Sequence, residues 1–216
     1  MALPDNNAEP TDSTGPARDL ADRPGSGRQA PRNSEPEQGD TTAATRPTLV
    51  LTGFMGTGKS TVGRLLAERL GATFIDTDRV LIERHGPIED LFASHGEAHF
   101  RDLERHLATE LSDVTGAVIA TGGRMLLDQK ARHAFDRRCT TICLTAEAST
   151  ILARVTNDDS GINRPLLAGD DPLQRIIDLL EQRHPLYRTF PQVNTDGRPS
   201  SDVVDEIIER FANQER

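Results

Sequence analysis

The glycine-rich segment 53–60 has the residue types and spacing to bind the phosphates of a nucleotide. It reads GFMGTGKS and matches the pattern G-x-x-x-x-G-K-[ST]. In such a loop backbone N–H groups point at the phosphates, a lysine (Lys59) reaches the β- and γ-phosphates, and a hydroxyl (Ser60) ligates Mg²⁺. The residues of this segment and its flank that we expect to contact the nucleotide are Gly56, Thr57, Gly58, Lys59, Ser60 and Thr61.

Two carboxylates, Asp76 and Asp78, follow the next apolar run and could serve a phosphoryl acceptor. Side chains spaced i, i+2 at the carboxyl end of a strand point the same way. One carboxylate could orient the shell of Mg²⁺ through water, and the other could contact an acceptor hydroxyl and act as its base. The structural alternative is that Asp78 only caps the helix that follows.

Three arginines offer cations for an anionic substrate. Arg101 and Glu104 are three residues apart, a spacing that alone favours an ion pair on a helix surface. Arg164 lies in a polar loop from which it could close over the transferring phosphoryl group. Arg183 lies near a predicted helix end, and its guanidinium could grip a carboxylate. Taken singly, these arginines are typical of a solvated surface rather than of a binding site. At Gly122 and Gly123, in contrast, the absence of side chains lets the backbone approach a ligand.

The predicted elements alternate between strands and helices, which favours a parallel sheet covered on both faces. We therefore expect a three-layer α/β/α fold with a central five-stranded parallel sheet. The predicted strands are 48–53, 72–76, 117–121, 140–144 and 192–195. The predicted helices are 59–70, 79–84, 88–94, 97–113, 128–136, 147–156, 172–183 and 201–212. Residues 157–171, rich in polar residues and broken by Gly and Pro, are predicted to form a mobile lid.

Composition separates a tail from a domain. The chain has 216 residues and a formal net charge of −9, and residues 1–46 contain no Ile, Val, Phe or Tyr. Such a segment cannot bury enough apolar surface to offset the entropy of ordering it, so we expect a disordered tail at 1–46 and one domain at 47–216. No apolar run is long enough to span a membrane, and the acidic balance disfavours nucleic-acid binding. We expect a cytoplasmic monomer.

The phosphate-binding loop indicates a nucleotide but not a reaction. A guanine-binding protein would normally carry an Asn-Lys-x-Asp segment, and neither lysine of the chain, Lys59 or Lys130, lies in one. Small proteins of this length with such a loop are most often small-molecule kinases.

In their order, the motifs resemble those of the shikimate kinases. The resemblance extends from about residue 48 to about residue 212. The matching pieces are GFMGTGKST at 53–61, DTD at 76–78, FRDLE at 100–104, Gly122-Gly123, NRPLL at 163–167 and RHPLY at 183–187. It implies a P-loop fold like that of the nucleoside-monophosphate kinases. It also implies ATP and Mg²⁺ as cofactors and phosphorylation of the 3-hydroxyl of shikimate, a step of chorismate and aromatic amino-acid biosynthesis.

The resemblance also implies residue roles. Asp78 matches the residue that binds ring hydroxyls and is the candidate base, and Asp76 matches a position associated with magnesium. The residues matched to acceptor binding are Arg101 and Arg183, which bind the shikimate carboxylate, and Gly123, which gives a backbone contact. Those matched to the nucleotide are Arg164 of the lid, which meets the phosphates, and Arg154, which packs on adenine opposite residues 196–199. Lys59, Asp78 and Arg164 are thus the expected catalytic residues.

One departure concerns the acceptor. The family usually has a third glycine where this chain has Arg124, whose side chain could point away or bring a new cation to the substrate carboxylate. Two alternatives to a shikimate kinase therefore stay open. One is a kinase for another small hydroxy acid such as gluconate, and the other is a noncatalytic nucleotide-binding homologue.

Overall fold

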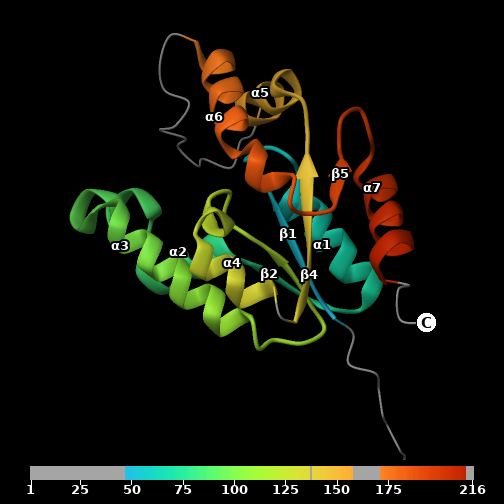
Figure 1. Ribbon diagram of the computed structural model, residues 1–216, viewed down its shortest axis with the longest axis horizontal. Coiled ribbons are helices and arrows are strands. Elements are labelled where there is room, and N and C mark those ends of the chain that lie inside the picture. The colour runs from blue at the N-terminus through green and yellow to red at the C-terminus, as the bar shows by residue number, and fades with distance from the viewer. Residues whose placement is uncertain (1–46, 137, 158–170, 213–216) are drawn as a thin grey trace, which may run out of the picture. The chain divides into compact units, whose positions relative to one another are not determined.

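A five-stranded parallel sheet lies at the centre of the computed structural model, which describes residues 47–136, 138–157 and 171–212 (Figure 1). Its strand order is β2-β3-β1-β4-β5, and every pairing is parallel. The strands are β1 (Thr48–Gly53), β2 (Thr73–Asp76), β3 (Ala117–Ala120), β4 (Cys139–Thr145) and β5 (Gln192–Asn194). Because β1 is the middle strand, the segment that follows it lies between the ends of β3 and β4.

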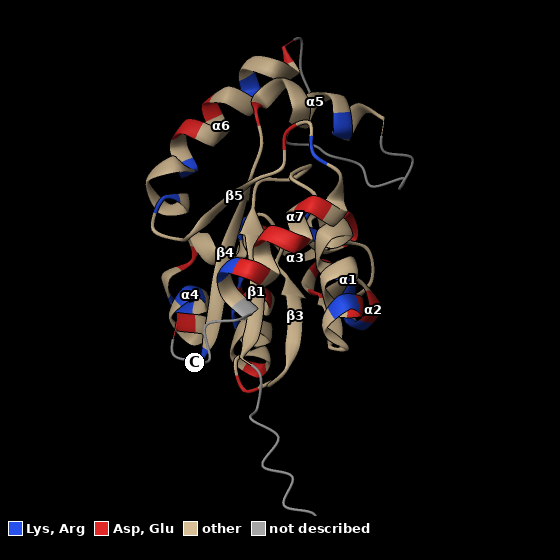
Figure 2. Cartoon of the chain, turned by 90° about the vertical axis from the view of Figure 1, so that its right-hand side faces the viewer, with Lys and Arg blue, Asp and Glu red and all other residues tan. Residues whose placement is uncertain are grey.

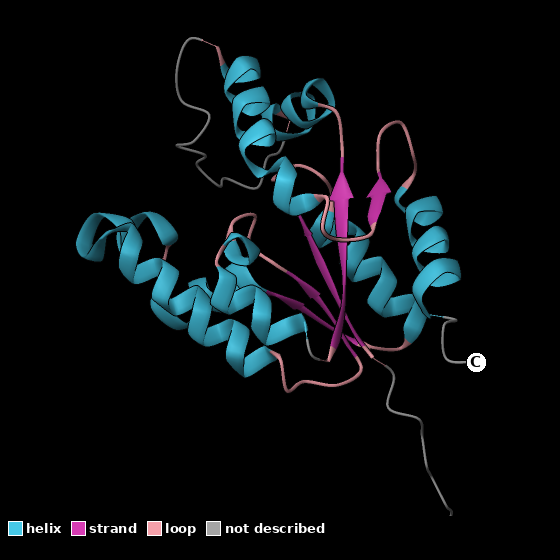
Figure 3. Ribbon diagram, viewed as in Figure 1, coloured by secondary structure: helices cyan, strands magenta, loops and turns pink. Residues whose placement is uncertain are grey.

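Helices cover both faces of the sheet, as the strands enclosed by helices in Figure 3 show. The helices are α1 (Lys59–Leu70), α2 (Thr77–His85), α3 (Ile88–Leu111), α4 (Gln129–Asp136), α5 (Ala148–Thr156), α6 (Pro172–Tyr187) and α7 (Ser200–Ile207). Short helical turns follow at η1 (Met125–Leu127) and η3 (Ile208–Ala212). The expected three-layer α/β/α fold with five parallel strands is therefore confirmed.

The alternation of side chains along β1 explains why helices pack on both faces of the sheet. Leu49 and Leu51 of β1 pack with residues of α1 and α7, whereas Val50 between them packs with residues of α3 and α4. Successive side chains of a strand point to opposite faces, so a fully apolar strand buries both. Asp76 is the one charged residue of the five strands, and the ribbon of Figure 2, coloured by residue type, has its acidic and basic positions mostly on helices and loops.

The helix α3 contains the predicted break. Gly96 has φ 79° and ψ 167°, which interrupts the helical path between residues 88–95 and 97–111. Glycine adopts this conformation without the steric cost that a Cβ would bring. The interruption confirms two helical segments, and it places Glu97 at the start of the second one.

The helix α6 is longer than predicted. We expected it to run to about residue 183. Pro185 lies beyond that point, and proline removes one helical hydrogen bond. The helix continues to Tyr187, which is buried and donates its hydroxyl hydrogen bond to the Gly123 carbonyl at 3.1 Å. Tertiary anchoring of the last turn thus offsets the local cost of the proline.

Parts of the prediction fall outside the described residues. The expected tail at 1–46 and nearly all of the expected lid at 157–171, with Arg164, lie there, so both stay predictions. Among the helices that the structure describes, none is both long enough and apolar enough to cross a bilayer.

Among the described glycines, Gly53 at the end of β1 has the least room for a side chain. Gly53 has φ 132°, and a Cβ at this position would overlap the carbonyl oxygen of Leu144 on β4. Gly71, which ends α1, also has a positive φ of 61°, but a Cβ there would meet nothing within 4 Å. The two glycines therefore share a backbone requirement and differ in the space around them.

We expect Gly53→Ala to lower the free energy of unfolding far more than Gly71→Ala. The left-handed conformation alone costs a side chain about 1–2 kcal/mol. Overlap with the β4 backbone should raise the loss at Gly53 to about 3 kcal/mol or more. Urea unfolding of both variants measures the difference, and equal losses would contradict the close approach of β1 to β4.

Candidate active site

The segment after β1 forms a turn in which the Thr57 N–H group donates back to the Phe54 carbonyl at 3.4 Å. Thr57 is buried, and its hydroxyl donates to the Phe54 carbonyl at 2.8 Å. Gly58, with φ 91°, turns the chain into α1, which begins at Lys59 without a side-chain cap. The first N–H groups of a helix lack intrahelical partners and carry a partial positive charge. The loop and this helix start together form a site for phosphate oxygens.

Lys59 is held at the loop that it is expected to serve. Its Nζ donates to the Phe54 carbonyl at 2.9 Å. Burial lowers the pKa of Lys59, whereas the nearby carboxylates of Asp78 and Asp76 raise it. A largely desolvated ammonium group binds a phosphate more strongly than one in water would.

Ser60 and Asp76 form a pair of oxygen atoms beside this loop. The Ser60 hydroxyl donates to Asp76 Oδ2 at 2.6 Å, while Asp76 Oδ1 accepts from the backbone N–H groups of Asp78 and Arg79. Asp76 is thus the N-cap of α2, so the alternative in which Asp78 caps this helix does not hold. A hydroxyl and a carboxylate at a phosphate site fit Mg²⁺, which prefers oxygen ligands and takes the rest from phosphate and water.

Asp78 lies in the first turn of α2 with a raised pKa. Burial and the neighbouring charge of Asp76 raise the pKa of Asp78 to about 6, against the opposing effect of Lys59 and Arg101. A Cβ on Gly122 would overlap Asp78 Oδ1, so glycine at 122 makes room for this carboxylate. A carboxylate with such a pKa accepts a proton more readily than an exposed one.

The backbone at 122–123 joins three parts of the site. The Gly122 N–H donates to the Thr77 hydroxyl at 2.8 Å, which ties the end of β3 to the start of α2. A Cβ on Gly123 would lie 3.6 Å from both the Gly53 carbonyl oxygen and the Met55 nitrogen. The Gly123 carbonyl also accepts from Arg183 Nη1 at 3.3 Å. The end of β3 therefore lies between the phosphate loop and α6.

Arg183 is buried rather than solvated. It is 5 % exposed, and its guanidinium carbon lies 4.8 Å from the centroid of the Phe54 ring. Among the described residues, its side chain contacts a backbone carbonyl, an aromatic ring and the Tyr187 hydroxyl, and none of these partners is a carboxylate. A buried cation with neutral partners strongly favours an anionic ligand.

Arg101 is held by two carboxylates of its own helix. Its Nη1 donates to Glu104 Oε2 at 2.6 Å, and its Nη2 donates to Glu97 Oε1 at 3.0 Å. The expected ion pair between Arg101 and Glu104 is confirmed, but its expected place on the surface is wrong, because Glu104 is 3 % exposed. Burial raises the pKa of Glu104, and the Arg101 charge opposes that rise. Glu104 therefore positions Arg101 from the inside of the fold.

Arg154 connects the end of the sheet to the phosphate loop. Its Nη1 donates to the Gly56 carbonyl at 3.2 Å and to the Thr195 hydroxyl at 2.9 Å, and its Nη2 donates to the Thr195 carbonyl at 2.7 Å. Residues 196–199 follow directly. This arrangement suits the expected packing of Arg154 on adenine, which stays a prediction.

The roles of Phe54, Glu104 and Tyr187 were not predicted. All three are buried, and each supports an arginine or the backbone at Gly123. Each lies inside or beside a quoted motif, but no pattern of spacing separates a buried supporting residue from an exposed neighbour.

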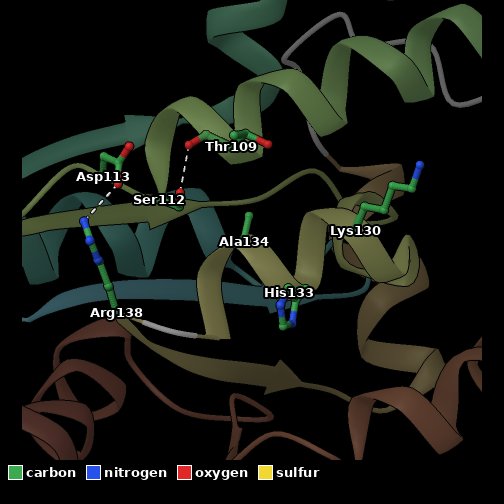
Figure 4. Close-up of a pocket in the computed structure, with 7 residues that line it drawn as sticks. All are labelled: Thr109, Ser112, Asp113, Lys130, His133, Ala134 and Arg138. Atoms are coloured by element: carbon green, nitrogen blue, oxygen red, sulfur yellow. Dashed lines mark hydrogen bonds and ion pairs between the residues drawn. The ribbon is translucent and has the colours of Figure 1, made fainter.

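A separate cavity of about 530 Å³ lies away from these residues (Figure 4). It is lined by Thr109, Ser112, Asp113, Lys130, His133, Ala134 and Arg138. These residues belong to the end of α3 and to α4 and its flank, which precede β3 and β4 in the chain. The cavity is therefore at the amino ends of the strands, whereas ligands of open α/β sheets bind at the carboxyl ends.

Comparisons of the sequence and of the structure with known proteins point to the same family. A family profile described as "Shikimate kinase" matches residues 55–212. A shikimate kinase of Symbiobacterium thermophilum is 43 % identical over 172 residues, which cover 78 % of this chain and 97 % of that protein. One of Thermus thermophilus is 42 % identical over 165 residues, covering 76 % of this chain and 89 % of that protein. A solved shikimate kinase of Acinetobacter baumannii, in complex with shikimate, superposes with a TM-score of 0.72 at 34 % identity and covers 79 % and 96 % of the two chains.

We expect Asp78→Asn to change how stability depends on pH in the ligand-free, Mg²⁺-free protein. The folded-state pKa of about 6 is above the unfolded value, so the folded state binds the extra proton between about pH 4 and pH 6. The parent protein should therefore lose stability as the pH rises through this window. The variant should become the more stable protein by about 2–3 kcal/mol at pH 8, with little difference at pH 4.

Urea unfolding across this pH range measures the effect. Asp136→Asn, at an exposed position on α4, is the matched control and should follow the parent protein. Parallel profiles for Asp78→Asn and the parent would show that the Asp78 pKa is not raised.

Proposed function

The chain belongs to the shikimate kinase family, and from this premise we propose that it transfers the γ-phosphoryl group of ATP to the 3-hydroxyl of shikimate. The products are shikimate 3-phosphate and ADP, on the route to chorismate and the aromatic amino acids. One observation carries the proposal: Lys59 of the phosphate-binding loop interacts electrostatically both with the half-buried Asp78 carboxylate and with the buried Arg183 guanidinium. This arrangement supports a kinase for a small acid that carries a hydroxyl group.

The nucleotide half of the site is the loop 53–60 with the start of α1. Its amides and the Lys59 ammonium group bind the phosphates, and Arg154 packs on the adenine. Arg164 closes over the transferring group from the lid. Charge that develops on the phosphoryl oxygens is stabilised by donors that are already in place.

The acceptor half consists of Asp78, Arg101, Gly123 and Arg183. The two arginines bind the shikimate carboxylate, and the Gly123 backbone contacts the ring. This carboxylate anchor orients the 3-hydroxyl toward the γ-phosphate, and orientation alone supplies a large part of such a rate enhancement.

Asp78 takes the proton that the acceptor loses. The acceptor oxygen forms a bond to the γ-phosphorus, the bond from that phosphorus to the β,γ-bridging oxygen breaks, and the hydroxyl proton passes to the Asp78 carboxylate. ADP leaves with the bridging oxygen. The raised pKa of Asp78, about 6, makes it a better proton acceptor than an exposed aspartate.

The oxygens of Ser60 and Asp76 would hold Mg²⁺. The ion supplies neutralising charge at the β- and γ-phosphates when it is bound. The Ser60 hydroxyl oxygen and Asp76 Oδ2 lie 2.6 Å apart, and this short separation supports their binding of one ion.

The alternatives receive less support. A kinase for gluconate would use the same carboxylate chemistry, but the named relatives at 42–43 % identity are shikimate kinases. A noncatalytic homologue would not need Lys59, Ser60 and Asp78 assembled around one loop. We also propose that the protein acts as a monomer in the cytoplasm, without nucleic-acid or membrane partners.

Coupled ADP-release assays with shikimate and with gluconate test the substrate. We expect turnover with shikimate and none above the ATPase background with gluconate. Activity with gluconate alone would assign a different acceptor, and no activity with either would favour the noncatalytic alternative.

Lys59→Ala should lower kcat at least about 100-fold, because it removes the charge that stabilises the transferring phosphoryl group. The same assay measures it. Lys130→Ala is the matched control, since Lys130 is the other lysine of the chain and lies in the cavity away from the site. Turnover of Lys59→Ala at the parent rate would refute the nucleotide assignment.

Arg183→Ala should raise the KM for shikimate about 10- to 100-fold, because the variant loses a charge-assisted pair of hydrogen bonds to the carboxylate. The KM for ATP should change less. Arg175→Ala, an exposed arginine of the same helix, is the control and should keep the parent values. Thermal melting verifies that Arg183→Ala folds. An unchanged KM in the folded variant would remove Arg183 from the carboxylate anchor.

A further inference from the structure

Arg124 occupies an ordinary backbone position. Its φ is −117° and its ψ is −9°, which any L-residue adopts, so nothing in the backbone requires glycine here. The residue directly follows Gly123, which contacts both the phosphate loop and α6. A side chain at position 124 therefore begins at the edge of the acceptor half of the site.

The Arg124 side chain turns toward α3 rather than into open solvent. Its Nη1 donates to Glu97 Oε1 at 2.8 Å. The same oxygen accepts from Arg101 Nη2 at 3.0 Å and from Arg101 Nε at 3.2 Å. A single carboxylate oxygen thus joins two arginines that come from separate elements of the fold.

Glu97 Oε1 contacts Arg101 and Arg124 as a carboxylate oxygen of a bound ligand would. Glu97 is exposed over 55 % of its side chain, and Arg124 over 40 %. Exposed ion pairs stabilise a protein by about 1 kcal/mol or less, so another carboxylate can replace this one readily. Arg101, in contrast, stays fixed from below by the buried Glu104.

The arginines of the acceptor half differ in their carboxylate partners. Glu97 pairs with both Arg101 and Arg124, and Glu104 pairs with Arg101. Arg183 has no carboxylate partner among the described residues. Burial raises the pKa of both Glu104 and Tyr187, and the Arg124 charge is among the charges that oppose this rise. Arg124 is therefore electrostatically coupled to the residues that support Arg101 and Gly123.

We propose that Arg124 determines acceptor specificity as a third cation for the acceptor's carboxylate, and that Glu97 stands in for this carboxylate in the free enzyme. When the acceptor binds, its carboxylate replaces the Glu97 oxygen between Arg101 and Arg124. The proposal rests on the proposed function, because it needs a carboxylate-bearing acceptor in this half of the site. The proposal adds Arg124 to the acceptor-binding residues, at a position where the family usually has a glycine.

The first test compares Arg124→Gln and Arg124→Gly with the parent enzyme. The KM for shikimate should rise about 5- to 20-fold, as expected for one partly exposed charge-assisted contact, while kcat and the KM for ATP stay within about twofold. Arg124→Lys, which keeps the charge, should restore part of the loss. Arg175→Gln is the control for the loss of a surface arginine and should leave the KM for shikimate unchanged.

A second measurement separates a carboxylate contact from general disturbance. Isothermal titration without nucleotide compares shikimate with its carboxamide, which lacks the negative charge. Arg124→Gln should weaken binding of shikimate and leave binding of the carboxamide unchanged. Equal weakening of both ligands, or of neither, would overturn the proposal.

The role of Glu97 is tested by Glu97→Gln, alone and with Arg124→Gln. Removing the competing charge should lower the KM for shikimate about two- to fivefold, and this gain should disappear when Arg124 is also changed. A KM that rises in Glu97→Gln would overturn the stand-in role. If the parent enzyme itself shows no shikimate-dependent ADP release, the proposed function fails; if the parent is active and Arg124→Gln keeps its KM, only this inference fails.

Discussion

The parallel pairing of β1 with both of its neighbours is the constraint on which the rest of the site depends. The parallel pairing of β1 with β3, and of β3 with β2, brings the carboxyl ends of these three strands to one edge of the sheet. The phosphate loop, the two aspartates and the glycine pair each follow one of these ends, so residues up to seventy positions apart meet. The pairing with β4 is so close at Gly53 that no side chain fits there.

Burial, more than charge alone, gives the site its properties. Lys59 and Asp78 lie near each other with opposite charges, yet burial shifts the pKa of each toward its neutral form. Arg183 is desolvated against Phe54 and has no described carboxylate partner. Such groups cost folding free energy while the site is empty, and ligand charge relieves that cost.

The sequence predicted the elements well because their patterns are local. The apolar run of β1, the glycine that ends α1 and the glycine break in α3 all act within a few residues. The end of α6 was missed because the Tyr187 contact with Gly123 spans much of the chain and outweighs the effect of Pro185. Helix periodicity places Glu104 on the same face as Phe100 and Leu107, but its charge favoured an exposed ion pair, because acidic side chains are rarely buried.

The backbone conformation at position 124 has a consequence for how the enzyme can change over evolutionary time. Gly122 cannot vary without displacing Asp78, and Gly53 cannot vary without displacing β4. Position 124, in contrast, has a backbone that any residue adopts, and its side chain is partly exposed. Substitutions there are therefore compatible with the fold, and under the proposed role of Arg124 they would adjust acceptor preference. Relatives with different residues at this one position would form a natural series in substrate selection.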